Sequence, residues 1–271
     1  MKFSYYLYPP SYEDSTINII EKNLKTLNCL LINHADDFDS FFYDKSLLGL
    51  KFKNGLSFCD IIYGKLSDKQ FMQQILPKML MKLNYCNHAY TNKSNLDTFF
   101  SESENAFWGI RFSSTELYNI TCIEDYSKFR YKTIRDAINN INFKTLKDVL
   151  FKKIVFCDDV PNMLNSIGKK EFEQMIERLI ALDNYNIGWT NSNFNLKEIN
   201  EKTSLTVSDE SDTVKNDNKL KSYRYFTLPN NLGGKYCYYH IKTGDFRLHF
   251  YPDVSSHKIY VAYIGTHLPL R

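Results

Sequence analysis

The sequence predicts an α+β protein, in which a helix-rich mixed N-terminal region is followed by a small C-terminal antiparallel β-sheet domain. Apolar residues recur at helical spacing through much of the first 190 positions, a polar stretch follows, and the C-terminal end alternates between apolar and polar residues. We therefore expect a mixed region at residues 1–190, a polar linker or long loop at 191–222 and a sheet domain at 223–271.

The N-terminal region opens with an amphipathic helix over residues 13–32. Its apolar residues recur three and four positions apart, and Ser15 or Asp14 is a candidate cap. Residues 46–64 have the composition of short strands that turn at an Asn-Gly pair.

Further helices and one strand complete this region. Residues 67–83 begin with a capping box of Ser67 and Gln70, and the helical pattern is kinked or broken at Pro77. Apolar spacing also predicts helices over residues 131–141, 143–153 and 169–185, and a short buried strand over 154–159.

Aromatic and β-branched runs separated by turn residues predict the strands of the C-terminal sheet, at residues 223–228, 235–242, 245–251 and 258–265. In the third run Phe246, Leu248 and Phe250 share one face, which we expect to meet a core. The sequence "TGD" at 243–245 is expected to form the hairpin turn between the second and third strands.

The opposite face of this hairpin gathers basic side chains. The turn brings His240 and Lys242 beside Arg247 and His249, and His267 follows the last strand at the rim of the sheet. A polar, solvated face would show the same alternation. The absence of glutamate from this face favours a functional interpretation, because protein surfaces usually mix both charges.

The distribution of charge points the same way. The chain carries a net charge of +3, yet residues 224–271 hold six Lys and Arg against two acids, which leaves −1 for residues 1–223. A local basic field suits RNA, DNA or a nucleotide, and a basic surface without a partner is the alternative. The acidic "SDESD" at 208–212 is either a solvated linker or a shield for this face.

Several classes of function lack their signature. The six cysteines are at least 27 residues apart, which supports neither a zinc motif nor a disulfide framework. There is no P-loop, dinucleotide fingerprint or HExxH, and we expect no cofactor and no metal. The carboxylates of "HADDFDSFFYD" at 34–44 are an alternative magnesium site, although caps and solvated loops use the same residues.

The sequence also predicts the compartment. No run of about twenty apolar residues is present, so we expect no transmembrane helix and no membrane partner. The N-terminus lacks the basic-then-apolar order of a signal peptide, and we therefore expect a cytoplasmic protein.

Residues 236–268 resemble the last three strands of the RelE-like toxin fold, the fold of the RelE, YoeB and HigB type mRNA interferases. The resemblance lies in a strand ending in His-x-Lys, in "GDFRLHF" and in "KIYVAYIGTH". It implies that Arg247 contacts the scissile phosphate, that His267 performs acid–base work, and that Lys242 and His240 match residues of the preceding strand. The chain departs from the family in its linker and in roughly two hundred extra upstream residues.

The chemistry of these side chains is coherent with RNA cleavage. Such cleavage without a metal needs a base for the 2′-hydroxyl, an acid for the 5′-oxygen and cations for the phosphate, and histidine and arginine supply these. The candidate catalytic residues are Arg247, His267 and His240. The candidate phosphate- or RNA-binding residues are Lys242, His249, Tyr251 and Arg224.

We therefore expect a toxin-like endoribonuclease or a nucleic-acid-binding effector that needs no metal, in a bacterial toxin–antitoxin or anti-phage defence system. A protein partner, such as an antitoxin or a complex subunit, would bind through residues 1–190. The alternative is a non-enzymatic interaction or assembly protein, whose C-terminal sheet binds nucleic acid or a protein.

Overall fold

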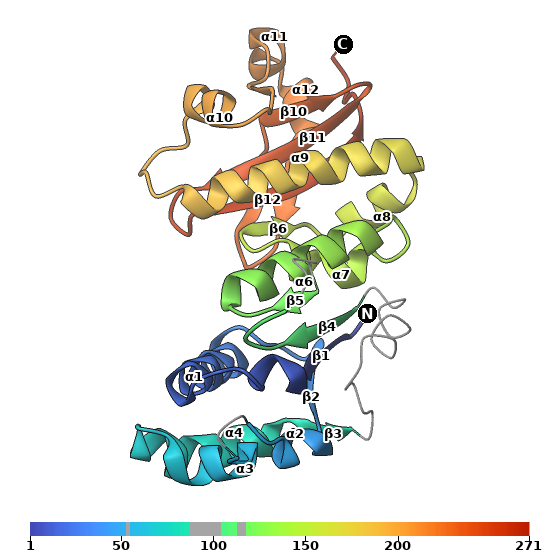
Figure 1. Ribbon diagram of the computed structural model, residues 1–271. Coiled ribbons are helices and arrows are strands. Elements are labelled where there is room, and N and C mark those ends of the chain that lie inside the picture. The colour runs from blue at the N-terminus through green and yellow to red at the C-terminus, as the bar shows by residue number, and fades with distance from the viewer. Residues whose placement is uncertain (53–54, 87–103, 113–117, 271) are drawn as a thin grey trace. The chain divides into compact units, whose positions relative to one another are not determined.

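The computed structural model describes residues 1–52, 55–86, 104–112 and 118–270. The chain divides into two compact units, unit 1 (Met1–Asp136) and unit 2 (Ala137–Arg271). The fold is a mixture of helices and strands, as predicted, and the C-terminal strands form sheets (Figure 1). None of the described helices combines the length and apolar composition that crossing a bilayer requires.

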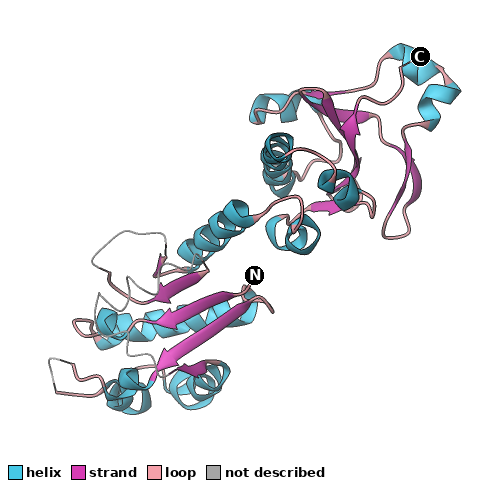
Figure 2. Cartoon of the chain, turned by 90° about the vertical axis from the view of Figure 1, so that its right-hand side faces the viewer, coloured by secondary structure: helices cyan, strands magenta, loops and turns pink. Residues whose placement is uncertain are grey.

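Unit 1 contains a five-stranded sheet in the order β3-β2-β1-β4-β5, in which every neighbouring pair is parallel (Figure 2). The strands are β1 (Phe3–Leu7), β2 (Asp39–Asp44), β3 (Asn84–Cys86), β4 (Asn105–Trp108) and β5 (Asn119–Ile120). The helical segments are η1 (Pro9–Tyr12), α1 (Ile17–Asn33), α2 (Lys45–Gly49), α3 (Phe58–Asp60), η2 (Ile61–Lys65), η3 (Phe71–Ile75), α4 (Leu76–Lys82) and α6 (Ile123–Ala137).

This parallel sheet was not evident from the sequence, because its strands are short and its central strands do not alternate. In β1, four of the five residues are buried, and all four residues of β4 are buried. Strands of parallel sheets that are covered on both faces read as continuous apolar runs and resemble buried helix segments.

The helix α1 is fastened to this sheet by one buried amide. The Asn23 Oδ1 accepts hydrogen bonds from Tyr12 Oη at 2.8 Å and from Trp108 Nε1 at 2.9 Å. The Asn23 Nδ2 donates to the Gly109 carbonyl at 3.0 Å. Because all these groups are buried, Asn23 satisfies polar atoms that no water reaches.

Two local predictions for unit 1 differ from the structure. Residues expected as strands over 46–64 are mostly helical, because Ser57 and Asp60 form a capping box that starts α3. Among the described residues of this segment, strand pairing is limited to an isolated antiparallel bridge between Lys51 and Ser57. The Ser67 hydroxyl donates to Glu21 instead of capping its own helix.

Unit 2 contains a second five-stranded sheet, in the order β6-β12-β11-β10-β7, and a separate two-stranded hairpin. The sheet consists of β6 (Ile154–Phe156), β7 (Val207–Ser208), β10 (Tyr239–Thr243), β11 (Phe246–Asp253) and β12 (Lys258–Thr266), and the hairpin of β8 (Tyr225–Leu228) and β9 (Gly233–Tyr236). β6 runs parallel to β12, and the other pairs are antiparallel. The helices are α7 (Phe143–Leu150), α8 (Val160–Asn165), α9 (Lys169–Gly188), α10 (Leu196–Lys202), α11 (Asp212–Asn216) and α12 (Asn218–Ser222).

The expected linker at 191–222 is an ordered part of unit 2, and it contains α10, β7, α11 and α12. Its polar side chains act as helix caps, since Asn195, Ser211 and Asp217 each accept backbone N–H groups at a helix start. Five of its seven apolar residues are buried, namely Ile199, Leu205, Val207, Val214 and Leu220, and Phe194 and Leu196 are half-buried. The division between units therefore lies at residue 136 rather than at residues 191–222.

The β10–β11 hairpin has the register that the alternation predicts. His240 lies opposite His249, and Lys242 lies opposite Arg247. Gly244 adopts a φ of +58° in the turn, a conformation that favours glycine. Leu248 and Phe250 are fully buried, and the Phe194 ring, which follows α9, packs on Phe250.

The polar face of this sheet is also covered. We call residues 209–237 the cover segment, because Glu210, Phe226 and Cys237 of this stretch contact residues on the histidine face of the sheet. The Phe226 ring stacks on Tyr263 of β12, and the Cys237 carbonyl lies 3.2 Å from His249 Nδ1. The part of this face that carries His240 and His249 is consequently buried.

Candidate functional site

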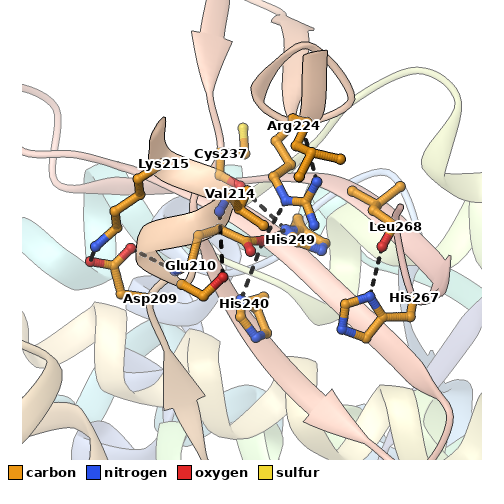
Figure 3. Close-up of polar contacts among 12 residues, drawn as sticks. Asp209, Glu210, Val214, Lys215, Arg224, Cys237, His240, His249, His267 and Leu268 are labelled. Atoms are coloured by element: carbon orange, nitrogen blue, oxygen red, sulfur yellow. Dashed lines mark hydrogen bonds and ion pairs between the residues drawn. The ribbon is translucent and has the colours of Figure 1, made fainter. Parts of the chain in front are cut away.

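The two histidines of the hairpin form a buried pair beneath the cover segment (Figure 3). His240 is 7% exposed and His249 is 2% exposed, and their ring centroids are 5.2 Å apart. They are adjacent because residues directly opposite each other on antiparallel strands place their side chains on the same face.

A carboxylate of the cover segment completes this cluster. The Glu210 Oε1 lies 3.8 Å from Nδ1 of His240 and 3.8 Å from Nδ1 of His249. The same oxygen accepts a hydrogen bond from Arg224 Nε at 2.6 Å. Figure 3 shows the Glu210 carboxylate between the Arg224 guanidinium and the imidazoles.

Burial keeps both imidazoles neutral near pH 7. The pKa of His249 is lowered to about 3, mainly by desolvation and secondarily by the neighbouring His240. Desolvation also lowers the pKa of His240, although the Glu210 carboxylate opposes that shift. Neutral imidazoles have a free lone pair, so these rings act as acceptors or metal ligands.

A second, more open group of side chains lies at one end of the same sheet. Arg247 on β11 lies opposite both Lys242 on β10 and Gly265 on β12, and His267 follows the end of β12. Lys242 and His267 are exposed, and Arg247 is half-buried. No described acidic residue forms an ion pair with any of these three cations. We call Lys242, Arg247 and His267 the cationic edge.

Two members of the cationic edge are held by backbone carbonyls. The Arg247 Nη1 donates to the carbonyls of Gly244 and Phe246, at 2.9 and 2.8 Å. The Arg247 Nε is buried and has no hydrogen-bond partner among the described residues. The His267 Nδ1 lies 2.7 Å from the Leu268 carbonyl, which only accepts, so the proton of the neutral ring sits on Nδ1 and Nε2 is left as the acceptor.

The remaining predicted site residues lie elsewhere. Arg224 is fully buried, and its guanidinium binds Glu210 and the carbonyls of Leu220 and Pro269. Tyr251 lies four residues along β11 from Arg247, a separation of about 13 Å in an extended strand. Its ring lies under Lys235 at 5.8 Å.

Two carboxylates of the acidic stretch at 34–44 are paired with an arginine. Asp36 and Asp39 bind Arg130 of α6 through contacts of 2.5 and 2.9 Å. Tyr126 also donates to Asp39 at 2.8 Å. These carboxylates are thus neutralised by a guanidinium, which occupies the place that a cation would take.

Glu210 is a residue of this cluster that is not among the site residues predicted from the sequence. Its only signal in the sequence is the acidic "SDESD" beside the basic segment, which is either a solvated linker or a shield of the cationic face. The structure brings one acid of this stretch, Glu210, against the buried histidines, whereas Asp209 pairs with Lys215 at 2.5 Å. Spacing alone does not distinguish these neighbouring acids.

Comparison with protein-family models, with curated proteins and with solved structures finds no match to this chain.

Proposed function

We propose that unit 2 binds the phosphate backbone of single-stranded RNA at the cationic edge and cleaves it there. The observation that carries this proposal is that Lys242 and Arg247 face each other across two strands without a described carboxylate partner. Cations that are unpaired in the free protein are available to neutralise phosphates, which dominate the affinity of proteins for nucleic acids.

Arg247 is the proposed phosphate clamp. Its guanidinium is anchored through Nη1 by the carbonyls of Gly244 and Phe246, and no described hydrogen bond engages its Nη2. A guanidinium binds two phosphate oxygens at once, whereas an ammonium acts as a point charge. Lys242 supplies the second positive charge on the same face.

His267 is the proposed general base, because it is the exposed histidine of the group and its Nε2 is free to accept a proton. In the proposed reaction Nε2 takes the proton of the 2′-hydroxyl, and the resulting oxygen attacks the adjacent phosphorus. The bond from phosphorus to the 5′-oxygen breaks, that oxygen takes a proton from water, and the hydroxide that remains takes the proton from His267, which restores the neutral ring. The products are a 2′,3′-cyclic phosphate and a 5′-hydroxyl, and no metal takes part in these steps.

The predicted role of His240 in catalysis requires a revision within this proposal. His240 lies beneath the cover segment, so RNA at the cationic edge reaches His267 and not His240. The resemblance to RelE-like toxins, the cytoplasmic location and a protein partner for residues 1–190 stay predictions.

The test uses a fluorescently labelled single-stranded RNA and the full chain, with binding followed by anisotropy and cleavage by gel. Arg247→Ala should lower the cleavage rate by about 10²-fold or more, the usual effect of removing one oxyanion contact. Arg247→Lys should recover little of the cleavage rate, because an ammonium cannot bind two phosphate oxygens at once as a guanidinium does. Lys258→Ala, at the start of β12, is the matched control and should behave like the parent chain.

The same measurements separate cleavage from binding alone. An RNA with a 2′-deoxy sugar at the scissile position should bind and remain intact. Binding without cleavage of the all-ribose RNA would favour the non-enzymatic alternative, and the burial of His240 and His249 is the observation that supports that alternative. Absence of binding, or an Arg247→Ala chain with full activity, would contradict the proposal. In cells, induced expression should arrest growth unless Arg247 is replaced.

A further inference from the structure

We infer that Glu210, His240 and His249 form a binding site for one divalent transition-metal ion, with zinc as the preferred ion. This site lies under the cover segment and is separate from the RNA-binding role proposed for the cationic edge. It joins three parts of unit 2, since His240 belongs to β10, His249 to β11 and Glu210 to the residues before α11.

The spacing of the ligand atoms supports the site. One ligand atom from each residue lies within 4.8 Å of the other two. Tetrahedral zinc with bonds of about 2.0–2.2 Å places its ligand atoms roughly 3.3–3.6 Å apart. The 3.8 Å between Glu210 Oε1 and each Nδ1 therefore needs only a small contraction to reach coordination distance.

A second, independent observation is an unsatisfied nitrogen. His240 Nδ1 is buried and has no hydrogen-bond partner among the described residues, and its nearest carboxylate oxygen is too distant for a hydrogen bond. Buried polar atoms in folded proteins nearly always have a partner. A metal ion between the imidazoles and the carboxylate supplies that partner.

Neighbouring groups orient the ligands as they do in metal sites. Arg224 Nε donates to Glu210 Oε1 at 2.6 Å, and the described hydrogen bond of this carboxylate leaves Oε2 unused. The Cys237 carbonyl, 3.2 Å from His249 Nδ1, only accepts, so in the metal-free chain this nitrogen carries the proton of the ring, and a bound ion would displace that proton. Metal-binding carboxylates typically have an outer partner such as Arg224.

The donor set indicates which ion the site takes. Two imidazole nitrogens and one carboxylate suit zinc and its neighbours among the transition metals, whereas magnesium and calcium prefer oxygen ligands throughout. The positive charge of Arg224 opposes any cation, so we expect binding weaker than in an all-anionic site. Three protein ligands leave a fourth position for water.

The ion would fasten the cover segment to the sheet. Glu210 and His240 are thirty residues apart in the sequence and come together only in the folded chain. An ion that binds both residues therefore stabilises the folded state. Zinc should therefore raise the melting temperature and should slow amide exchange or proteolysis within residues 209–237.

The test uses the full chain, stripped with EDTA and dialysed, and zinc chloride as the probe in calorimetric titration and thermal unfolding. The parent chain should bind one zinc ion and melt at a higher temperature with it. His240→Gln should weaken zinc binding by more than about 100-fold, beyond the range for loss of an outer partner. This variant should fold, because His240 Nδ1 makes no hydrogen bond in the metal-free chain.

His257→Gln is the matched control, since His257 is a half-buried histidine of the same unit whose Nε2 is also unpaired among the described residues. It should bind zinc like the parent chain. Cobalt substitution gives a further readout, because coordination by nitrogen and oxygen lacks the charge-transfer absorption that thiolates produce. The inference is overturned if the parent chain binds no zinc, if His240→Gln binds it equally well, or if cobalt reports thiolate ligands.

Discussion

Arg224 and Glu210 form a fully enclosed ion pair, with Nε 2.6 Å from Oε1 and side-chain exposures of 0% and 4%. The pair lies within the cover segment, and Arg224 also binds the Pro269 carbonyl near the C-terminus. One guanidinium thus connects the residues that cover the histidines with the residues that follow the last strand.

Replacing Arg224 with Met should destabilise unit 2 strongly. The substitution leaves the Glu210 charge buried without its partner, and loss of one member of a buried pair typically costs about 3–5 kcal/mol. Urea unfolding of the parent and variant chains measures the difference. Lys215→Met is the control, because its pair with Asp209 is partly exposed and should contribute less than about 1 kcal/mol. Equal effects of the two substitutions would contradict this account.

Replacing Asn23 with Leu should destabilise unit 1. The change leaves the Tyr12 hydroxyl and the Trp108 indole N–H buried without their acceptor, at about 1–3 kcal/mol for each unsatisfied group. Unfolding followed by tryptophan fluorescence, with Trp108 as the reporter of unit 1, measures the loss. Asn33→Leu, at the exposed end of the same helix, should have little effect, and a similar loss in that variant would exclude the buried-network explanation.

Replacing Lys242 with Ala should weaken RNA binding most at low salt. Each phosphate contact to a single strand contributes about 0.7 to the slope of log affinity against log salt, so the slope should fall by about that amount. Anisotropy titrations at several salt concentrations give the slope. Lys258→Ala should leave it unchanged, and an unaltered slope in Lys242→Ala would remove Lys242 from the RNA contacts.

The Cys157 thiol should react slowly near pH 8. Desolvation raises the pKa of Cys157 to about 11, with the nearby Asp158 and Asp159 acting in the same direction. Relative to a free thiol with a pKa of about 8.5, its thiolate fraction at pH 8 falls by more than about 100-fold. Because the pKa of Cys157 is raised in the folded chain, the reactivity of its thiol should rise as the pH approaches 11. The unfolded chain loses this proton at a lower pH than the folded chain, so the free energy of unfolding should fall as the pH rises toward 11. Alkylation with peptide-resolved mass spectrometry checks this against the half-buried Cys29, and equal rates would contradict it.

EDTA should separate the two proposals. Removing the ion from Glu210, His240 and His249 should lower the melting temperature, whereas RNA cleavage well below that temperature should persist, because His267 performs the proton transfer. Cleavage that disappears with EDTA and returns with zinc, in a chain that stays folded, would assign the metal a chemical role. A melting temperature that EDTA does not change would contradict the metal site and would leave the RNA-cleavage proposal unaffected.

The sequence by itself determined the parts of the fold that depend on local periodicity. The long amphipathic pattern predicts α9, and the alternation on both sides of Gly244 predicts the β10–β11 hairpin with His240 opposite His249. These features follow from the 3.6- and 2-residue repeats of helices and strands, which the chain shows without reference to its neighbours. The alternation also placed Lys242 beside Arg247.

The tertiary structure decided what covers each face. The parallel order of β1 and its neighbours depends on pairings between residues far apart in the sequence, and short buried strands carry no period that reveals them. The polar stretch at 191–222 has the composition of a linker, yet three of its polar side chains cap helices and five of its seven apolar residues are buried. Only the folded chain brings Glu210 against His240 and His249, because that contact requires the cover segment to return over the sheet, and composition does not encode the path of a loop.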